Sequence, residues 1–232
     1  STLLRCINAL TRITQGSIAL NGEVFVNSEN GQVQNKNGQT EAVYPSEKEL
    51  KRICCETGMV FQHFNLFPHK TILENITLAP IKLLKKDKAE AEKEARELLK
   101  RVGLEEKADS YPSQLSGGQK QRTAMARMLA GEPEILMLDE PFTALDNYMK
   151  MQLERELMKV MEDYGKTVLF VSHDRNEAYR MTDRIAVMED GQILDVQPKE
   201  ELFQNPASLA ATLLTGCKNV SMLQAESDGG YA

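Results

Sequence analysis

The sequence predicts an α/β protein in which a parallel sheet is flanked by helices and accompanied by antiparallel β hairpins. Short apolar runs alternate with segments of helical periodicity along the second half of the chain, in the order 135–138, 148–163, 167–171 and 175–181. This β-α-β-α order is typical of parallel strands joined by crossover helices. The chain has 232 residues, of which 41% are hydrophobic, so it can bury a core of domain size.

Two dipeptides predict the hairpins, because Asn-Gly and Asp-Gly favour the tight turns that join antiparallel strands. Each is flanked by short alternating runs: Asn21-Gly22 by 17–20 and 23–26, and Asp190-Gly191 by 185–187 and 193–196. The stretch from 27 to 40 is rich in Asn, Gly and Gln, and we interpret it as a surface loop or a ragged hairpin without chemistry of its own.

Helices are also indicated in the first half of the chain. Apolar side chains at spacings of three and four predict a helix over residues 2–10. A second apolar face recurs at 91–102 inside a stretch dominated by Lys and Glu, which is typical of a helix with one solvated side. Asp87 and Glu90 predict a capping pair at its start, and Gly103 favours a left-handed stop at its end.

Composition and charge exclude several classes of protein. Lys and Arg total 28 against 34 for Asp and Glu, and the net charge of -6 gives no overall positive field to attract nucleic acid. No apolar stretch approaches the roughly 20 residues that a membrane-spanning helix needs. The four cysteines, at positions 6, 54, 55 and 217, lack the spacing of a zinc site, and a reduced cytosolic protein is expected.

A glycine-rich segment precedes a helical pattern in the middle of the chain. Leu115-Ser116-Gly117-Gly118-Gln119 is followed by helical spacing over 120–129. Free amide groups and the positive end of the helix dipole converge at such a start, and two residues without Cβ let an anion approach the backbone. A phosphate group fits this geometry. Ser-Gly-Gly before a helix is also a common N-cap loop, and these residues alone leave that alternative open.

Two carboxylates end an apolar strand. Asp139 and Glu140 follow the run 135–138, and ligands bind at the carboxyl ends of strands in open α/β sheets. Successive strand residues point opposite ways, so one acid can orient a hydrated magnesium ion and the other an attacking water. The alternative is a polar strand end without chemistry.

Two further polar residues follow short apolar runs. His173 comes after 168–171 and Ser172, which predicts an imidazole at the same sheet edge as the two acids. A structural histidine is the alternative. Gln62 follows Met59-Val60-Phe61, and its amide either senses a metal or water or faces solvent.

In their order and separations, these residues resemble the ATP-binding cassette ATPases. The resembling set comprises Gln62, Leu115 to Gln119, Asp139 with Glu140, Asp146 in Ala144-Leu145-Asp146, and His173. The resemblance implies that they form the Q-loop, the signature sequence, the end of the Walker B strand, the D-loop and the switch histidine, respectively. It also implies a P-loop NTPase (RecA-like) core with an inserted helical subdomain.

The opening residues extend the resemblance. Ser1-Thr2-Leu3-Leu4 is similar to the residues from the final Ser/Thr onward in the phosphate-binding motif G-x-x-x-x-G-K-[ST]. The expected domain therefore spans 1–232 as a copy that lacks its N-terminal strands and most of the phosphate loop. Its core lobe would take about 1–70 and 131–232, and its helical lobe about 71–130.

The resemblance implies two ligands, ATP and Mg²⁺, and a role for each site residue. The catalytic residues would be Glu140 and His173. The ATP-binding residues would be Ser1, Thr2, Gln62, Ser116, Gly117, Gly118, Gln119 and Asp146. The magnesium ligands would be Ser1, Gln62 and Asp139.

The resemblance also implies partners and a location. Cassette domains pair head to tail as a homodimer or with another cassette subunit, and each ATP lies between one phosphate loop and the other copy's signature helix. The pair would act on transmembrane permease subunits at the cytoplasmic face of a bacterial membrane, with a solute-binding protein as an indirect partner and without nucleic acid. Glu140 would polarise water and His173 would contact the γ-phosphate.

Different segments of the chain resemble importers of two different substrate classes. The segment 59–69, with Leu73-Glu74-Asn75 and Tyr111-Pro112, is similar to the ATPases of polar amino acid importers. The segments 140–146, 172–179 and 214–219 look more like molybdate-type oxyanion importers. We expect amino acid import, because the Q-loop region adjoins the surface that meets the membrane partner. Two alternatives from other classes are a soluble cassette ATPase acting on DNA or ribosomes, and a non-hydrolysing fragment.

Overall fold

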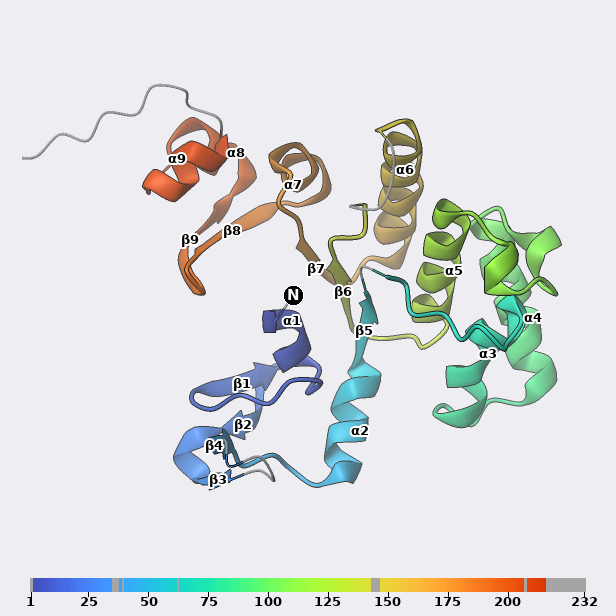
Figure 1. Cartoon of the computed structure of the whole chain (residues 1–232), viewed down its shortest axis with the longest axis horizontal. Helices are drawn as coiled ribbons and strands as arrows, with labels where there is room; N and C mark the ends of the chain where they lie inside the picture. The colour runs from blue at the N-terminus through green and yellow to red at the C-terminus, as the bar shows by residue number, and fades with distance from the viewer. Residues whose placement is uncertain are drawn as a thin grey trace, which may run out of the picture. The chain divides into compact units, whose positions relative to one another are not determined.

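The computed structural model describes residues 2–34, 38, 40–61, 63–142, 147–206 and 208–215. Its backbone divides into two compact units, Ser1–Val171 and Ser172–Ala232 (Figure 1), which we describe separately. Among the described residues, no helix combines the length and the apolar character that a membrane crossing requires.

The first unit opens with small antiparallel elements. In chain order these are α1 (Thr2–Ile7), β1 (Ser17–Leu20), β2 (Glu23–Asn27), η1 (Ser28–Asn30), β3 (Gln32–Gln34), β4 (Thr40–Ala42) and α2 (Glu47–Glu56). Asn21 and Gly22 have φ angles of 51° and 81°, as the tight turn between β1 and β2 requires, so the first predicted hairpin is confirmed. Between 27 and 40 the hairpin alternative is also confirmed, because β3 pairs with β4.

The first helix is shorter than predicted. Apolar spacing predicted helix over 2–10, but α1 ends at Ile7. Ala9 adopts a left-handed φ of 58°, which stops the helix, and Leu10 is 60% exposed instead of lying on a buried face. Side-chain spacing alone carries no information about this backbone reversal.

A parallel sheet forms the centre of the first unit. Its strands are β5 (Thr57–Val60), β6 (Ile135–Asp139) and β7 (Thr167–Val171), in the order β5-β6-β7. The register places Met59 beside Met137 and Met137 beside Leu169. The helix α6 (Asn147–Tyr164) connects β6 to β7, which confirms the predicted crossover.

Three helices pack side by side next to this sheet, as Figure 1 shows. They are α3 (Ile72–Lys82), α4 (Lys88–Arg101) and α5 (Gly117–Leu129), with the short turns η2 (Glu105–Lys107) and η3 (Pro112–Gln114) between the last two. Their shared core is a cluster of buried apolar residues that includes Ile72, Ile76, Leu99, Leu115 and Ala126. The predicted N-cap and stop of α4 are confirmed: the Asp87 carboxylate accepts the Ala89 N–H, and Gly103 has a φ of 65°. The predicted pairing of Asp87 with Glu90 is not found, because the Asp87 cap is made to Ala89 without a reciprocal bond from Glu90.

The helix α5 approaches the sheet closely. A Cβ added at Gly58 of β5 would lie 2.7 Å from side-chain carbons of Met128 and of Pro133. Glycine is therefore needed here, because it lets α5 and the following loop rest directly on the strand.

The second unit is a hairpin covered by short helices. Its elements are α7 (Arg175–Met181), β8 (Arg184–Glu189), β9 (Gln192–Pro198), α8 (Lys199–Gln204) and α9 (Leu209–Thr215). The predicted turn at Asp190-Gly191 is confirmed, with φ angles of 48° and 78°. Ile185 and Val187 of β8 pack with Leu202 and Ala211 in the core of this unit.

Candidate functional site

The two acids at the end of β6 have different surroundings. Asp139 is the last residue of the strand and is only 3% exposed, whereas Glu140 is half-buried. Glu140 leaves the strand in a left-handed conformation with a φ of 46°, and its N–H donates to the Val171 carbonyl at 3.0 Å. The sharp turn re-aims the Glu140 side chain, so the two carboxylates can take separate tasks.

The carboxyl ends of the three strands lie level with one another. Val60, the last residue of β5, pairs with Leu138, and Asp139 pairs with Val171. Gln62 comes two residues after Val60, but Gln62 itself lies outside the described residues. Behind this edge Phe142, which is 1% exposed, contacts the Phe170 ring with centroids 6.0 Å apart, so the base of the edge is apolar.

The glycine-rich segment forms the start of α5. Ser116 is the N-cap: its Oγ accepts the Gln119 N–H at 3.3 Å, and its own N–H donates to Gln119 Oε1 at 2.9 Å. Gly117 and Gly118 are the first two residues of the helix, where amide groups have no acceptor within the helix. The first turn contains no acidic residue, so the positive end of the helix dipole is not neutralised locally. This end of α5 can therefore receive an anion.

His173 is the second residue of the second unit and lies in a hydrogen-bonded turn. Ser172 Oγ donates to the Glu177 carboxylate and accepts the Asp174 N–H at 3.0 Å. The Asp174 carboxylate in turn caps α7, accepting the N–H groups of Asn176 and Glu177. Both neighbours of His173 are thus fixed, while its imidazole is exposed.

The structure describes only some of the remaining predicted site residues. Thr2 is the exposed first residue of α1. Ser1 and Asp146 lie outside the described residues, as Gln62 does. Within the first unit, β6 brings Asp139 and Glu140 together. Gly117 and Gly118 begin a different element, with Gly117 roughly 16 Å along α5 from Met128, the residue that packs on β5.

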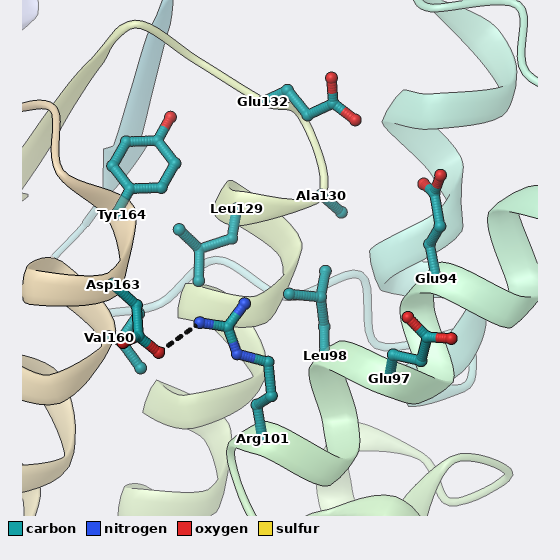
Figure 2. A pocket seen from close by; sticks show the side chains of 10 residues that line it. All are labelled: Glu94, Glu97, Leu98, Arg101, Leu129, Ala130, Glu132, Val160, Asp163 and Tyr164. Carbon is teal, nitrogen blue, oxygen red and sulfur yellow. Dashed lines mark hydrogen bonds and ion pairs between the residues drawn. The ribbon is translucent and has the colours of Figure 1, made fainter.

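Sequence reasoning missed a cavity of about 320 Å³ between α4, α5 and α6, which is lined by both charged and apolar side chains. Figure 2 shows Arg101 of α4 reaching Asp163 of α6, an ion pair of 2.8 Å, while Glu94, Glu97 and Glu132 line the other side. At the rim, the carboxylates of Glu132 and Glu94 raise the pKa of Lys86 through hydrogen bonds of 2.6 and 2.7 Å. The sequence pattern predicts that the charged side chains of α4 face solvent. No local signal indicates that α6 lies opposite α4.

Comparison with known proteins identifies the class. The family model described as ABC transporter matches residues 1–143, which is more than half of the chain. The chain belongs to this family.

Among curated relatives, glutamine transport ATP-binding protein GlnQ of Bacillus subtilis (strain 168) is 40% identical over 92% of this chain and 80% of its own length. Glutamate transport ATP-binding protein GluA of Corynebacterium glutamicum is 43% identical over 90% of this chain and 78% of its own. Glutamate/aspartate import ATP-binding protein GltL of Escherichia coli (strain K12) is 38% identical over 90% and 78%.

A solved structure supports the same assignment. The ATP-binding cassette MJ0796, in a dimeric post-hydrolysis state bound to ADP and Pi, matches with a TM-score of 0.68 and 35% identity. The match covers 85% of this chain and 79% of that one. The fold is therefore that of a P-loop NTPase, as predicted, and the chain is an ATP-hydrolysing ABC subunit.

Proposed function

We propose that this chain powers the import of polar amino acids by binding and hydrolysing ATP between two cassette copies. The observation that carries the chemistry is the end of β6, where a buried Asp139 is followed by a half-buried Glu140 in a sharp turn. The relatives GlnQ, GluA and GltL are named for glutamine, glutamate and aspartate transport, which favours amino acids over the oxyanion alternative.

Asp139 fits the magnesium role in this proposal. A carboxylate oxygen is the ligand type that Mg²⁺ prefers, and Asp139 ends a strand at the edge where α/β sheets bind ligands. Ser1 and Gln62 would supply the other protein oxygens. When bound, Mg²⁺ supplies positive charge that neutralises the phosphate oxygens.

Glu140 and His173 carry the catalytic roles. Glu140 would accept a hydrogen bond from the attacking water and orient it, which its half-buried position at the strand end permits. His173, held between two hydrogen-bonded neighbours, would donate to the γ-phosphate. Positioning and charge stabilisation are the main sources of catalysis in phosphoryl transfer, so fixed side chains suit the task.

The second half of the site would come from another copy. Ser116, Gly117, Gly118 and Gln119 would place the start of α5 against the triphosphate held by the facing subunit, and Thr2 and Asp146 would join the nucleotide contacts. The dimeric state of MJ0796 supports this arrangement.

In the same proposal, the core lobe consists of residues 1–70 and 131–232, and the helical lobe consists of residues 71–130. The pair of cassettes acts on permease subunits at the cytoplasmic face of the membrane. A solute-binding protein is an indirect partner.

One comparison tests the enzymatic proposal. MgATP hydrolysis is measured for this chain and for a version with a glycine- and lysine-containing phosphate loop joined ahead of Ser1. We expect phosphate release from the extended version and its loss in the same version carrying Glu140→Gln. If the extended version binds MgATP without releasing phosphate, the non-hydrolysing alternative replaces the enzymatic one. Glu134→Gln, at the residue just before the start of β6, is the matched control and should leave turnover unchanged.

A further inference from the structure

The turn that follows β5 contains two consecutive left-handed residues. Phe64 and Asn65 have φ angles of 61° and 45°. Phenylalanine rarely adopts this conformation, and Phe64 is also buried, with an exposed fraction of 7%. Backbone strain of this kind persists only where neighbouring groups hold it in place.

Arg127 of α5 holds this turn from one side. Its Nη1 donates to the Asn65 carbonyl at 2.7 Å and its Nη2 to the Phe64 carbonyl at 2.9 Å. The guanidinium carbon also lies 5.9 Å from the centre of the Phe67 ring. Burial lowers the pKa of the Arg127 guanidinium, but arginine keeps its proton in proteins, so both hydrogen bonds are charge-assisted.

Asn75 of α3 holds the next part of the same loop. It is fully buried, accepts the Phe67 N–H at 2.8 Å, and donates to the carbonyls of Phe67, Lys70 and Thr71. With both ends of the loop fixed, its tip displays Phe67, which is 39% exposed, followed by the exposed Pro68 and His69.

Arg127 also lies on the helix that begins with the signature glycines. Gly117 and Arg127 are ten residues apart in one uninterrupted helix, which corresponds to roughly 15 Å along its axis. A helix of this length is rigid, so a displacement of its first turn would move Arg127 by a similar distance. The two hydrogen bonds of Arg127 would carry such a displacement to the backbone of Phe64 and Asn65, whose left-handed conformations are strained.

We propose that Arg127 is a positioning residue that joins α5 to the turn at 63–67, so that nucleotide contact at Ser116–Gln119 changes the conformation of the exposed tip at Phe67. This inference rests on the proposed ATP-binding function. It assigns Arg127 a role in transmission and none in contacting the reacting phosphate.

The first experiment needs no nucleotide. Hydrogen exchange is followed at the amides of Phe64 and Asn65, whose N–H groups bond within the turn to the carbonyls of Phe61 and His63. Variants are Arg127→Gln, Arg127→Lys and, as matched control on the same helix, Arg122→Gln, whose side chain bonds instead to the Val102 carbonyl and to Glu156. Amides of β6 report whether each variant is folded.

We expect exchange at Phe64 and Asn65 to accelerate on the order of tenfold in Arg127→Gln and to change little in Arg122→Gln. Arg127→Lys should lie between them, because lysine keeps the charge but cannot bond two carbonyls with a planar fork. Unchanged exchange in folded Arg127→Gln overturns the proposal.

The second experiment uses MgATP and, as the parent, the extended version with a phosphate loop joined ahead of Ser1. We expect nucleotide to alter exchange at Phe67 and Lys70 in the parent and in Arg122→Gln, and to lose this effect in Arg127→Gln. The KM for MgATP should change less than about twofold, because Arg127 does not contact nucleotide. A full nucleotide response in Arg127→Gln overturns the transmission role. A parent that does not bind MgATP overturns the proposed function, and the nucleotide-free experiment then still decides whether Arg127 holds the turn.

Discussion

The backbone N–H of Glu140 donates to the carbonyl of Val171 at 3.0 Å, which ties the first residue after β6 to the last residue of β7. Glu140 makes this contact with a left-handed φ of 46°. The hydrogen bond extends the strand pairing by one residue, while the backbone reversal turns the Glu140 side chain away from the direction a strand residue would take. The geometry of the proposed catalytic acid is therefore fixed by the neighbouring strand.

Glu140→Gln should abolish turnover without unfolding the chain. The substitution keeps size and backbone but removes the carboxylate that orients water, so phosphate release should fall on the order of 100-fold or more. Single-turnover phosphate release measures the effect, and the thermal unfolding midpoint serves as the folding control. Turnover within a few-fold of the parent would exclude Glu140 as the catalytic base.

Valine at both Gly117 and Gly118 should prevent hydrolysis in the extended version that carries a phosphate loop ahead of Ser1. The added side chains would keep a phosphate away from the amides at the start of α5, removing a charge-stabilising contact that we expect to be worth on the order of 100-fold in rate. The steady-state rate of MgATP hydrolysis measures this loss, and Lys120→Ala, two residues after Gly118, is the control. Normal hydrolysis by the double variant would contradict the proposed role of the signature segment.

Asn75→Ala should destabilise the chain by roughly 2–4 kcal/mol, because the carbonyls of Phe67, Lys70 and Thr71 would lose a buried donor. Urea unfolding measures the change in the free energy of unfolding. Asn176→Ala, an exposed asparagine in α7, provides the comparison and should change stability by less than about 0.5 kcal/mol. Equal effects of the two substitutions would show that the Asn75 contacts contribute nothing net.

Asp163→Asn should cost less than about 1 kcal/mol of stability despite its short ion pair with Arg101. The two side chains are 65% and 50% exposed, so water and salt screen their attraction. Phe142→Ala, which empties a buried site, should cost about 3–5 kcal/mol. Urea unfolding at low and high NaCl compares them: only the Asp163 effect should shrink with salt, and a large, salt-independent Asp163 effect would contradict this explanation.

Glu74 should make stability depend on pH in the acid range. Its pKa is lowered from the usual 4.5, mainly because its carboxylate accepts the Thr71 N–H at 2.8 Å. A carboxyl group whose pKa is lower in the folded chain contributes stability above its unfolded pKa and loses it as the pH falls through the folded pKa. The stability difference between the parent and Glu74→Gln should therefore be constant above pH about 4.5 and shrink below it. Thermal unfolding across this range measures it, and a difference that stays constant throughout would refute the coupling.

Much of the local structure could be predicted because it depends on neighbouring residues. Asn21-Gly22 and Asp190-Gly191 form their turns with backbone angles that these residue types accept at low cost. The strand at 167–171 and the helix at 175–181 have the predicted bounds. The order of the motif residues along the chain also predicted the family that the comparisons established.

The tertiary structure decided what links distant positions. The left-handed conformations of Ala9 and Glu140 cannot be predicted from side-chain periodicity, because the surrounding tertiary contacts select such a conformation. The bonds from Arg127 to Phe64 and Asn65 join residues 63 and 62 positions apart, and each end looks unremarkable alone. The sequence by itself determined which elements form and which chemistry they carry; only folding determined which of those elements are held to one another, because that depends on long-range contacts.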